Sequence, residues 1–211
     1  MQGEKRCRAR DLGITIGSLS PGRWNAITDV PGVRVGYTTL ISGSGPLVTG
    51  NGPVRTGVTA IIPRDDLYEN PVFAGYHQLN GSGEMTGIAW IQESGLLAAP
   101  VALTNTHSVG IVRDAIIAHD LRRWDRGGSM PWRLPVVTET SDLWLNDMNG
   151  FHVKSEHLFA AIDNASGGPI AEGCVGGGTG AICHEFKGGT GTSSRVLSEA
   201  EGGWTVGVLV Q

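Results

Sequence analysis

The segment that most constrains this chain is residues 172–195, EGCVGGGTGAICHEFKGGTGTSSR, in which glycine runs are broken by Thr and Ser. Glycine lacks a Cβ, so its backbone can adopt positive φ, and another backbone or a ligand can approach closely. Ordering so many glycines costs conformational entropy, which indicates a segment that its surroundings hold in place. We expect two tight turns flanking a buried strand at residues 181–186.

A phosphate-binding loop is the alternative for the same segment, because residues 175–180, VGGGTG, look loosely like a nucleotide loop. No Gly-Lys-Ser/Thr sequence follows, and no clear helix opens after the run. The turn interpretation is therefore favoured.

Length and composition bound the class of protein. The 211 residues are enough to bury a core, and no linker-like stretch divides them, so we expect one domain over residues 1–211. A net charge of −4 gives no basic surface for nucleic acid, and no apolar run approaches the roughly 20 residues that cross a membrane. The N-terminus lacks the hydrophobic core of a signal peptide. The three cysteines have no metal spacing, so we expect reduced thiols in a cytoplasmic protein.

Hydrophobic periodicity predicts alternating strands and helices. Apolar and β-branched runs predict strands at residues 33–38, 56–63, 72–79, 100–104, 135–138 and 204–210. Helical spacing predicts helices at residues 85–94, 109–124 and 155–165, the second capped by Ser108. This order indicates α/β layers with helices packed on sheet faces. The last strand runs to the final residue without a polar tail, so we expect the chain to be one piece of a larger unit.

Two polar residues follow predicted strands, where α/β sheets commonly bind ligands. Glu139 ends the strand at residues 135–138, and its carboxylate would suit a cationic amine; a loop salt bridge is the alternative. Asn105 follows the strand at residues 100–104, and it would either bond substrate or hold the loop.

Other polar residues have structural interpretations. His107 could be a base, but a polar residue entering a helix is favoured. Glu84 precedes a predicted helix, whose dipole suits a carboxylate. Asn146, Asp147 and Asn149 are typical of turns. The remaining histidines form no ligand pattern, so we expect neither a metal nor a cofactor; they are His77, His119, His152, His157 and His184.

Six motifs stand in order along the chain: DVPGVRVGYTT, NGPVRTGVTAIIPR, LNGSGEMTGIAWIQESG, PVALTNTHSVGIVRDA, the segment from ET through WLNDMNGFHV, and EGCVGGGTGAICHEFKGGTGTSSR. Together they resemble the α-chain part of the L-aminopeptidase/D-esterase/amidase family, which includes the β-aminopeptidases. The similarity spans about residues 8–211 and implies a four-layer αββα sandwich of the ornithine-acetyltransferase-like, N-terminal-nucleophile-like type. It also implies a proenzyme that cleaves itself into α and β chains.

The resemblance implies a serine aminopeptidase that releases small L-, D- or β-amino acids from short peptides, amides or esters. In that family the nucleophile is a Ser at the N-terminus of the β chain, whose α-amine serves as base. This Ser and the oxyanion-hole Asn would lie beyond Gln211, so this chain alone is expected to be inert. The implied partners are the β chain, a peptide or amino-acid amide substrate, and further αβ units in a homo-oligomer.

Two site residues carry over from the resemblance. Glu139 matches the family Glu that pairs with the free amino group of the substrate. Ser141 falls where some members have Tyr and others an apolar residue, and where a backbone N–H or a side chain supports the oxyanion. Ser141 differs from the residues usual in the family at this position. Its backbone N–H could still support the oxyanion, but its side chain could not act as a Tyr side chain would. Leu143 replaces a common Gly, which would reshape the pocket edge.

Two other functions fit the same resemblance. An acyltransferase of the ornithine acetyltransferase type would share the fold and the self-cleavage, and would pass acetyl groups between amino acids. A non-catalytic small-molecule binding protein would result if the downstream nucleophile were missing.

Overall fold

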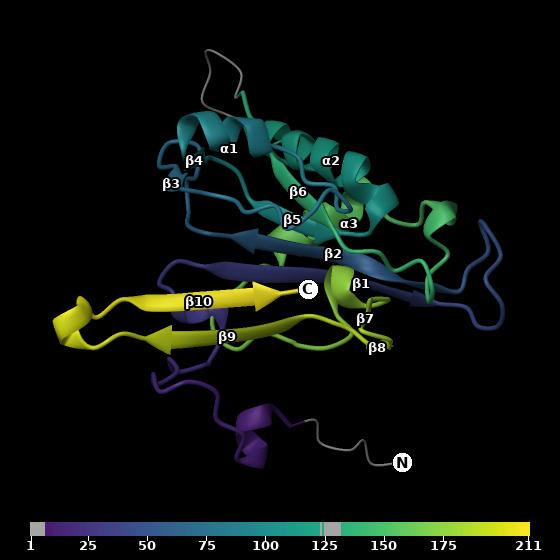
Figure 1. The fold of residues 1–211 in the computed structure, drawn as a ribbon. Helices are drawn as coiled ribbons and strands as arrows, with labels where there is room; N and C mark the ends of the chain where they lie inside the picture. Colours follow the sequence, from purple (N-terminus) through teal and green to yellow (C-terminus); the bar gives the residue numbers. More distant parts are fainter. Residues whose placement is uncertain (1–6, 123, 125–131) are drawn as a thin grey trace.

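The computed structural model describes residues 7–122, 124 and 132–211, and its main feature is a four-stranded mixed sheet. The strand order is β1-β2-β5-β6, with β1, β2 and β5 antiparallel in turn and β6 parallel to β5 (Figure 1). The chain is thus a mixed α/β fold. The sheet strands are β1 (Arg34–Ser42), β2 (Val54–Ile62), β5 (Val101–Thr104) and β6 (Val136–Glu139).

Helices α2 (Val109–Arg122) and α3 (Ser155–Asp163) cover one face of this sheet. Val112, Ile116 and Leu158 are completely buried there, and they form one core with Val58 and Val137 of the sheet. These apolar side chains lie on the side of each helix that packs against the sheet, as expected for helices that cover a sheet face.

The opposite face of the sheet receives the first glycine run. Gly176–Gly178 forms a buried 3₁₀ turn whose Gly176 N–H donates to the Thr39 hydroxyl at 2.9 Å. A Cβ on Gly57 of β2 would lie 2.6 Å from the carbonyl oxygen of Gly176, so the two backbones meet because neither residue has a side chain. The expectation that the glycine-rich segment is held by its surroundings is confirmed at this turn.

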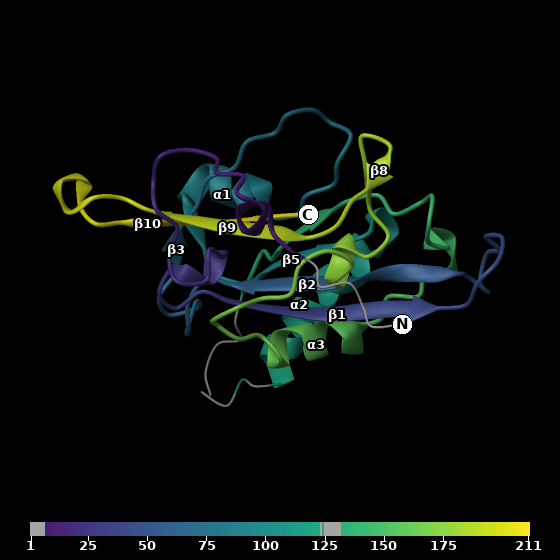
Figure 2. The ribbon, with the colours of Figure 1, turned by 90° about the horizontal axis from the view of Figure 1, so that it is seen from below.

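The second glycine run leads into a hairpin of β9 (Gly191–Val196) and β10 (Thr205–Val210). Figures 1 and 2 show this hairpin on the side of β1 and β2 that faces away from α3. Along β10, Val206, Val208 and Val210 are exposed, while the intervening residues are half-buried.

Shorter elements flank the main sheet. Strands β3 (Val72–Phe73) and β4 (Leu96–Leu97) form a two-stranded antiparallel sheet, and helix α1 (Ile88–Ser94) lies between them in the sequence. None of the described helices is both long and apolar enough to cross a lipid bilayer.

Most predicted elements are present, and several are shorter than predicted. The strand predicted at residues 72–79 ends at Phe73: it pairs with Leu96 and Leu97, and beyond Gly95 the partner segment is helix α1. The helix predicted from residue 85 begins at Ile88, because the preceding residues pair with β6 instead: Met85 bridges Thr138, and the Thr86 N–H donates to the Val137 carbonyl. The helix predicted at residues 109–124 ends at Arg122.

The prediction of a buried strand at residues 181–186 is wrong. This segment is an exposed hairpin of β7 (Ile182–Cys183) and β8 (Phe186–Lys187), which Figure 2 shows projecting from the body of the chain. His184 and Glu185 form its two-residue turn with φ values of 50° and 66°, the positive angles that match the twist of an antiparallel hairpin. His-Glu is not one of the usual two-residue hairpin turns such as Asn-Gly, so no turn was predicted at this position.

Candidate functional site

Three segments of the chain meet where β6 ends. Strands β5 and β6 are parallel, and Thr104 pairs with Glu139, so both strands end at the same edge of the sheet. The Thr140 N–H donates to the Thr104 carbonyl at 3.0 Å. From the third segment, the Glu84 carbonyl accepts a hydrogen bond from the Glu139 N–H at 3.2 Å. These hydrogen bonds fix the backbone of Glu139 and thus the position of its Cβ.

The Glu139 carboxylate is half-buried and has one hydrogen-bond donor on each oxygen. The Thr106 hydroxyl donates to Oε2 at 2.5 Å, and the Glu84 N–H donates to Oε1 at 3.3 Å. Within the described part of the chain, Glu139 forms no ion pair. The loop salt bridge considered as its alternative role is therefore not found among the described residues, and the negative charge stays available to a ligand.

Ser141, the other predicted site residue, lies two residues further on and is exposed. Its neighbour Asp142 turns inward and is only 1% exposed. Leu143, which the resemblance placed at the pocket edge, is 47% exposed. The geometry brings Ser141 to the same surface loop as Glu139, and its role in catalysis stays a prediction.

Beneath this loop lies a buried polar cluster of Thr56, Asn105, Asp142 and Asn146, none of them more than 2% exposed. The Asn146 amide donates to Asp142 Oδ1 at 3.0 Å, and the Asn105 amide donates to the Thr56 hydroxyl at 2.9 Å. Burial raises the pKa of Asp142, and the neighbouring side chains of Thr56, Asn146 and Asn105 have smaller lowering effects. The cluster fixes the loop that carries Ser141.

Asn105 itself holds the loop, as one of its two predicted roles required. It is buried, and its carbonyl also accepts from the Ser108 N–H at 3.0 Å, at the entry to α2. Among the residues that the structure describes, two oxygens of the cluster, Asn105 Oδ1 and Asp142 Oδ2, have no hydrogen-bond partner. A proton on Asp142, or a rotation of the Asn105 amide by 180°, would provide a donor between these groups.

The side chain of Gln211 ties the end of β10 to the same region. Its amide donates to the Thr140 hydroxyl at 2.7 Å, and its Oε1 accepts from the Thr59 hydroxyl at 3.0 Å. A Cβ on Gly177 would lie 2.7 Å from the Gln211 amide atoms, so the glycine run leaves space for this contact. The β9–β10 hairpin is thereby fastened beside Glu139.

The predicted turn residues Asn146, Asp147 and Asn149 lie between the turn at residues 143–145 and the end of the 3₁₀ turn Met148–Gly150, as expected. The side chains of Asn146 and Asp147 also make long-range contacts, which the turn interpretation did not include. Asn146 Oδ1 accepts from the Arg55 N–H at 2.9 Å, and Asp147 Oδ2 accepts from the N–H groups of Gly50 and Gly52. The pKa of the Asp147 carboxyl is lowered, and its hydrogen bond with His152 is the largest cause. These residues join the loop after β1 to the loop after β6.

His107 lies in the 3₁₀ turn Thr106–Ser108, directly before α2, and its exposed ring stacks on Phe151 with centroids 6.1 Å apart. This position agrees with a polar residue at the entry to a helix. Among the described residues, no group of three or more His, Cys, Asp or Glu side chains could hold a metal ion.

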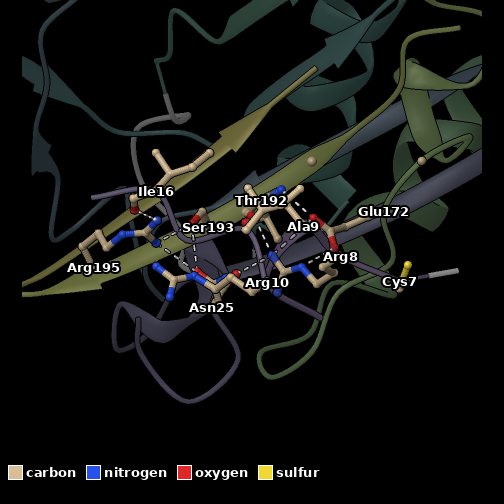
Figure 3. Close-up of a pocket in the computed structure, with 13 residues that line it drawn as sticks. Cys7, Arg8, Ala9, Arg10, Ile16, Asn25, Glu172, Thr192, Ser193 and Arg195 are labelled. Atoms are coloured by element: carbon tan, nitrogen blue, oxygen red, sulfur yellow. Dashed lines mark hydrogen bonds and ion pairs between the residues drawn. The ribbon is translucent and has the colours of Figure 1, made fainter. Parts of the chain in front are cut away.

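A pocket of about 630 Å³ lies elsewhere, between the N-terminal segment and β9 (Figure 3). Its polar side chains largely pair with the protein itself. Arg8 forms an ion pair with Glu172 at 2.9 Å and donates to the Asn25 carbonyl at 2.7 Å, while Arg195 donates to Ser193 at 2.7 Å. The pocket does not include Glu139 or Ser141, and its contacts fasten the N-terminal segment to the hairpin.

Sequence reasoning missed Thr106 and Asp142. Thr106 follows β5 as Glu139 ends β6, so a parallel pairing of these two strands would have placed both residues at one edge. Asp142 gave no signal of burial, because an Asp between Ser and Leu in a loop is usually exposed.

Comparison with known proteins gives consistent matches. The model of peptidase family S58 matches residues 25–211. The chain is 55% identical over 206 residues to the β-peptidyl aminopeptidase BapA of Sphingosinicella microcystinivorans and 50% identical over 204 residues to that of Sphingosinicella xenopeptidilytica. Both alignments cover 97% of this chain and 50% of the relative. The chain therefore spans about half the length of these relatives.

Solved structures show the same similarity. A Burkholderia sp. β-aminopeptidase matches with a TM-score of 0.90 and 56% identity, covering 97% of this chain and 56% of that protein. The L-aminopeptidase D-Ala-esterase/amidase of Ochrobactrum anthropi, described as a variant of the Ntn hydrolase fold, matches with a TM-score of 0.82 and 45% identity. That match covers 90% of this chain and 53% of the other protein. The sequence and the structure together show that this chain belongs to peptidase family S58.

Proposed function

We propose that this chain is the α-chain part of a self-processing serine aminopeptidase. The whole enzyme would release small L-, D- or β-amino acids from the N-termini of short peptides, amides or esters. Membership of peptidase family S58 supports this proposal, as do relatives at 50% and 55% identity that are β-peptidyl aminopeptidases. A β chain from the same precursor would supply the nucleophilic Ser, since the relatives are about twice as long as this chain.

The observation that carries the proposal is the Glu139 carboxylate. It is held by two neutral donors and has no cationic partner among the described residues. An ammonium group that leaves water needs a counter-charge, and this carboxylate offers one. Recognition of a free amino group beside the scissile bond would give aminopeptidase rather than endopeptidase action.

The remaining parts of the site follow from this arrangement. The β-chain Ser would attack the substrate carbonyl, and its own α-amine would take the proton. The backbone N–H of Ser141 would support the oxyanion of the tetrahedral intermediate. The tetrahedral intermediate would then collapse: the bond to the leaving amine or alcohol would break, and the protonated α-amine would give its proton to that leaving group. Water would then hydrolyse the acyl-enzyme and release the N-terminal amino acid. No metal or cofactor takes part in these steps.

We also propose the assembly in which this site would work. The α2–α3 layer, the main sheet and the β9–β10 hairpin would supply three parts of a four-layer αββα sandwich, which the β chain would complete. The resulting αβ units would form a homo-oligomer in the cytoplasm.

The intact mass and N-terminal sequence of the protein expressed from the complete gene test the proposal. Two chains, the second beginning with Ser, are expected, together with hydrolysis of an amino-acid p-nitroanilide. A single chain without this activity would support a binding protein instead. Two chains that transfer acetyl groups between amino acids faster than they hydrolyse the anilide would support an acyltransferase.

Replacement of Glu139 tests the proposed counter-charge. We expect Glu139→Gln to lower kcat/KM for an amino-acid p-nitroanilide by about 10- to 100-fold, because the substrate ammonium loses a charge-assisted hydrogen bond. Glu84→Gln is the matched control, since only the backbone of Glu84 contacts Glu139 and its side chain is exposed. Unchanged kcat/KM in the Glu139 variant would rule out this role.

A further inference from the structure

We propose that Thr106 is a positioning residue for the reaction: its hydroxyl orients the Glu139 carboxylate toward the ammonium group of the substrate. This inference rests on the proposed function, because it assigns a support to the residue that would bind the amine. The geometry that points to it is the 2.5 Å bond from Thr106 Oγ1 to Glu139 Oε2.

The need for a support follows from the Glu side chain. Three side-chain torsions separate the carboxylate of Glu139 from the sheet, so without contacts it would occupy several rotamers. The Thr106 hydroxyl holds Oε2, and the Glu84 N–H holds Oε1 from another segment. One donor on each oxygen fixes the plane of the carboxylate and leaves its remaining lone pairs for the substrate.

Of these two donors, Thr106 has the more rigid base. It stands between Asn105, which is 2% exposed, and the start of α2, where Val109 is 5% exposed. The Asn105 side chain is bonded to Thr56 of the central strand. By contrast, Glu84 ends the exposed loop at residues 80–84, and its bond to Glu139 is 3.3 Å long. We therefore assign most of the positioning to Thr106.

The chemistry of the donor also fits the proposed ligand. A Lys or Arg beside Glu139 would orient the carboxylate, but it would also neutralise the charge that a substrate ammonium needs. A hydroxyl donor orients the carboxylate and leaves its full negative charge. The β-branched Thr side chain is restricted at χ1, so its hydroxyl loses little entropy when it is held in one direction.

Three variants of the full-length, processed protein test the inference. Thr106→Val keeps the shape of the side chain and removes the donor; Thr106→Ser keeps the donor. We expect Thr106→Val to raise KM for an amino-acid p-nitroanilide about tenfold, the effect of losing a hydrogen bond to a charged group, with little change in kcat. Thr106→Ser should stay close to wild type. If Thr106→Val is not processed into two chains, Thr106→Ala removes the hydroxyl without placing an apolar methyl group against the carboxylate.

A double-mutant cycle separates positioning from general stabilisation. In a Glu139→Gln background, loss of the Thr106 hydroxyl should have little further effect on KM, because its target charge is gone. A merely structural role would raise KM or lower kcat by the same factor in both backgrounds. Wild-type KM in the Thr106 variant, or an undiminished effect in the Glu139→Gln background, would overturn the inference alone. A wild-type protein without aminopeptidase activity would overturn the proposed function as well.

Discussion

Two glycines show how neighbouring backbone decides what a single methyl group does. Gly36 lies in β1 where α3 crosses it, and a Cβ there would overlap the Ala161 carbonyl oxygen and lie 2.9 Å from the Ala165 backbone. Gly110 lies in the first turn of α2, and a Cβ there would meet no atom within 4 Å. The first glycine is required by packing, whereas the second is not.

This contrast predicts opposite effects of the same substitution. Gly36→Ala should destabilise the protein by about 1–3 kcal/mol, because helix α3 must move away from the sheet. Gly110→Ala should stabilise it by about 0.5 kcal/mol, because Ala has less freedom to lose on folding. Thermal denaturation of the two variants in parallel measures both effects. Equal melting temperatures would contradict the close packing of β1 on α3.

At the scale of elements, the loop after β6 is held both by its own turn and by contacts of Asp142 with a distant segment. Asp142 accepts from Asn146, and the backbone N–H groups of Leu145 and Asn146 both donate to the Asp142 carbonyl. Gly180 approaches this side chain so closely that a Cβ would lie 2.9 Å from the Asp142 Cβ. The loop that carries Ser141 therefore depends on one buried carboxyl.

Two replacements of Asp142 should differ sharply. Asp142→Asn keeps an acceptor for Asn146 and supplies a donor for the Asn105 oxygen, so it should preserve the fold. Asp142→Ala leaves the Asn146 donor unpaired and opens a cavity, at a cost of about 2–4 kcal/mol. Melting temperatures of both variants check this, and equal losses would contradict it.

The pKa of Asp142 adds a dependence on pH. Since its folded pKa is raised, the carboxyl contributes most stability below the unfolded value of about 3.9 and loses that contribution as pH rises through the folded pKa. Asp142→Asn cannot ionise. Relative to wild type, the melting temperature of this variant should therefore be higher at pH 7 than at pH 4.

At the scale of the whole molecule, Asp29 connects the N-terminal segment to the β9–β10 hairpin. Its carboxylate accepts from the Ser194 hydroxyl of β9 at 2.6 Å and from the N–H groups of Trp24 and Ala26. Burial acts to raise the pKa of Asp29, but hydrogen bonds from Ser194, Ala26 and Trp24 outweigh it and lower the pKa. This contact joins residues 165 positions apart in the chain.

The lowered pKa of Asp29 predicts that its contribution to stability is lost in acid. Its stabilising effect is present above the unfolded pKa of about 3.9 and is lost as pH falls through the folded pKa. Wild-type melting temperature should fall more steeply than that of Asp29→Asn between about pH 5 and pH 2. Asp114→Asn, at a largely exposed carboxylate, is the control and should follow wild type. Parallel curves for all three proteins would contradict the prediction.

Elements with local signals are predictable from the amino-acid sequence. The alternation at residues 33–38 predicts β1, the apolar run at residues 56–63 predicts β2, and the spacing of Val112 and Ile116 predicts α2. The position of Glu139 at a strand end was also predictable. These features depend on which face of a strand or helix a residue occupies, and that follows from spacing alone.

Contacts between distant residues, by contrast, depend on how the strands and helices pack. Thr106 and Glu139 are 33 positions apart, and their contact depends on the parallel pairing of β5 with β6, which no local pattern specifies. The burial of Asp142 depends on Thr56 and on the glycine run that covers it. The exposed β7–β8 hairpin likewise reflects the absence of a partner strand among the described residues, which an apolar run cannot reveal. Spacing fixes the direction of a side chain, whereas its neighbours come from the packing of distant segments.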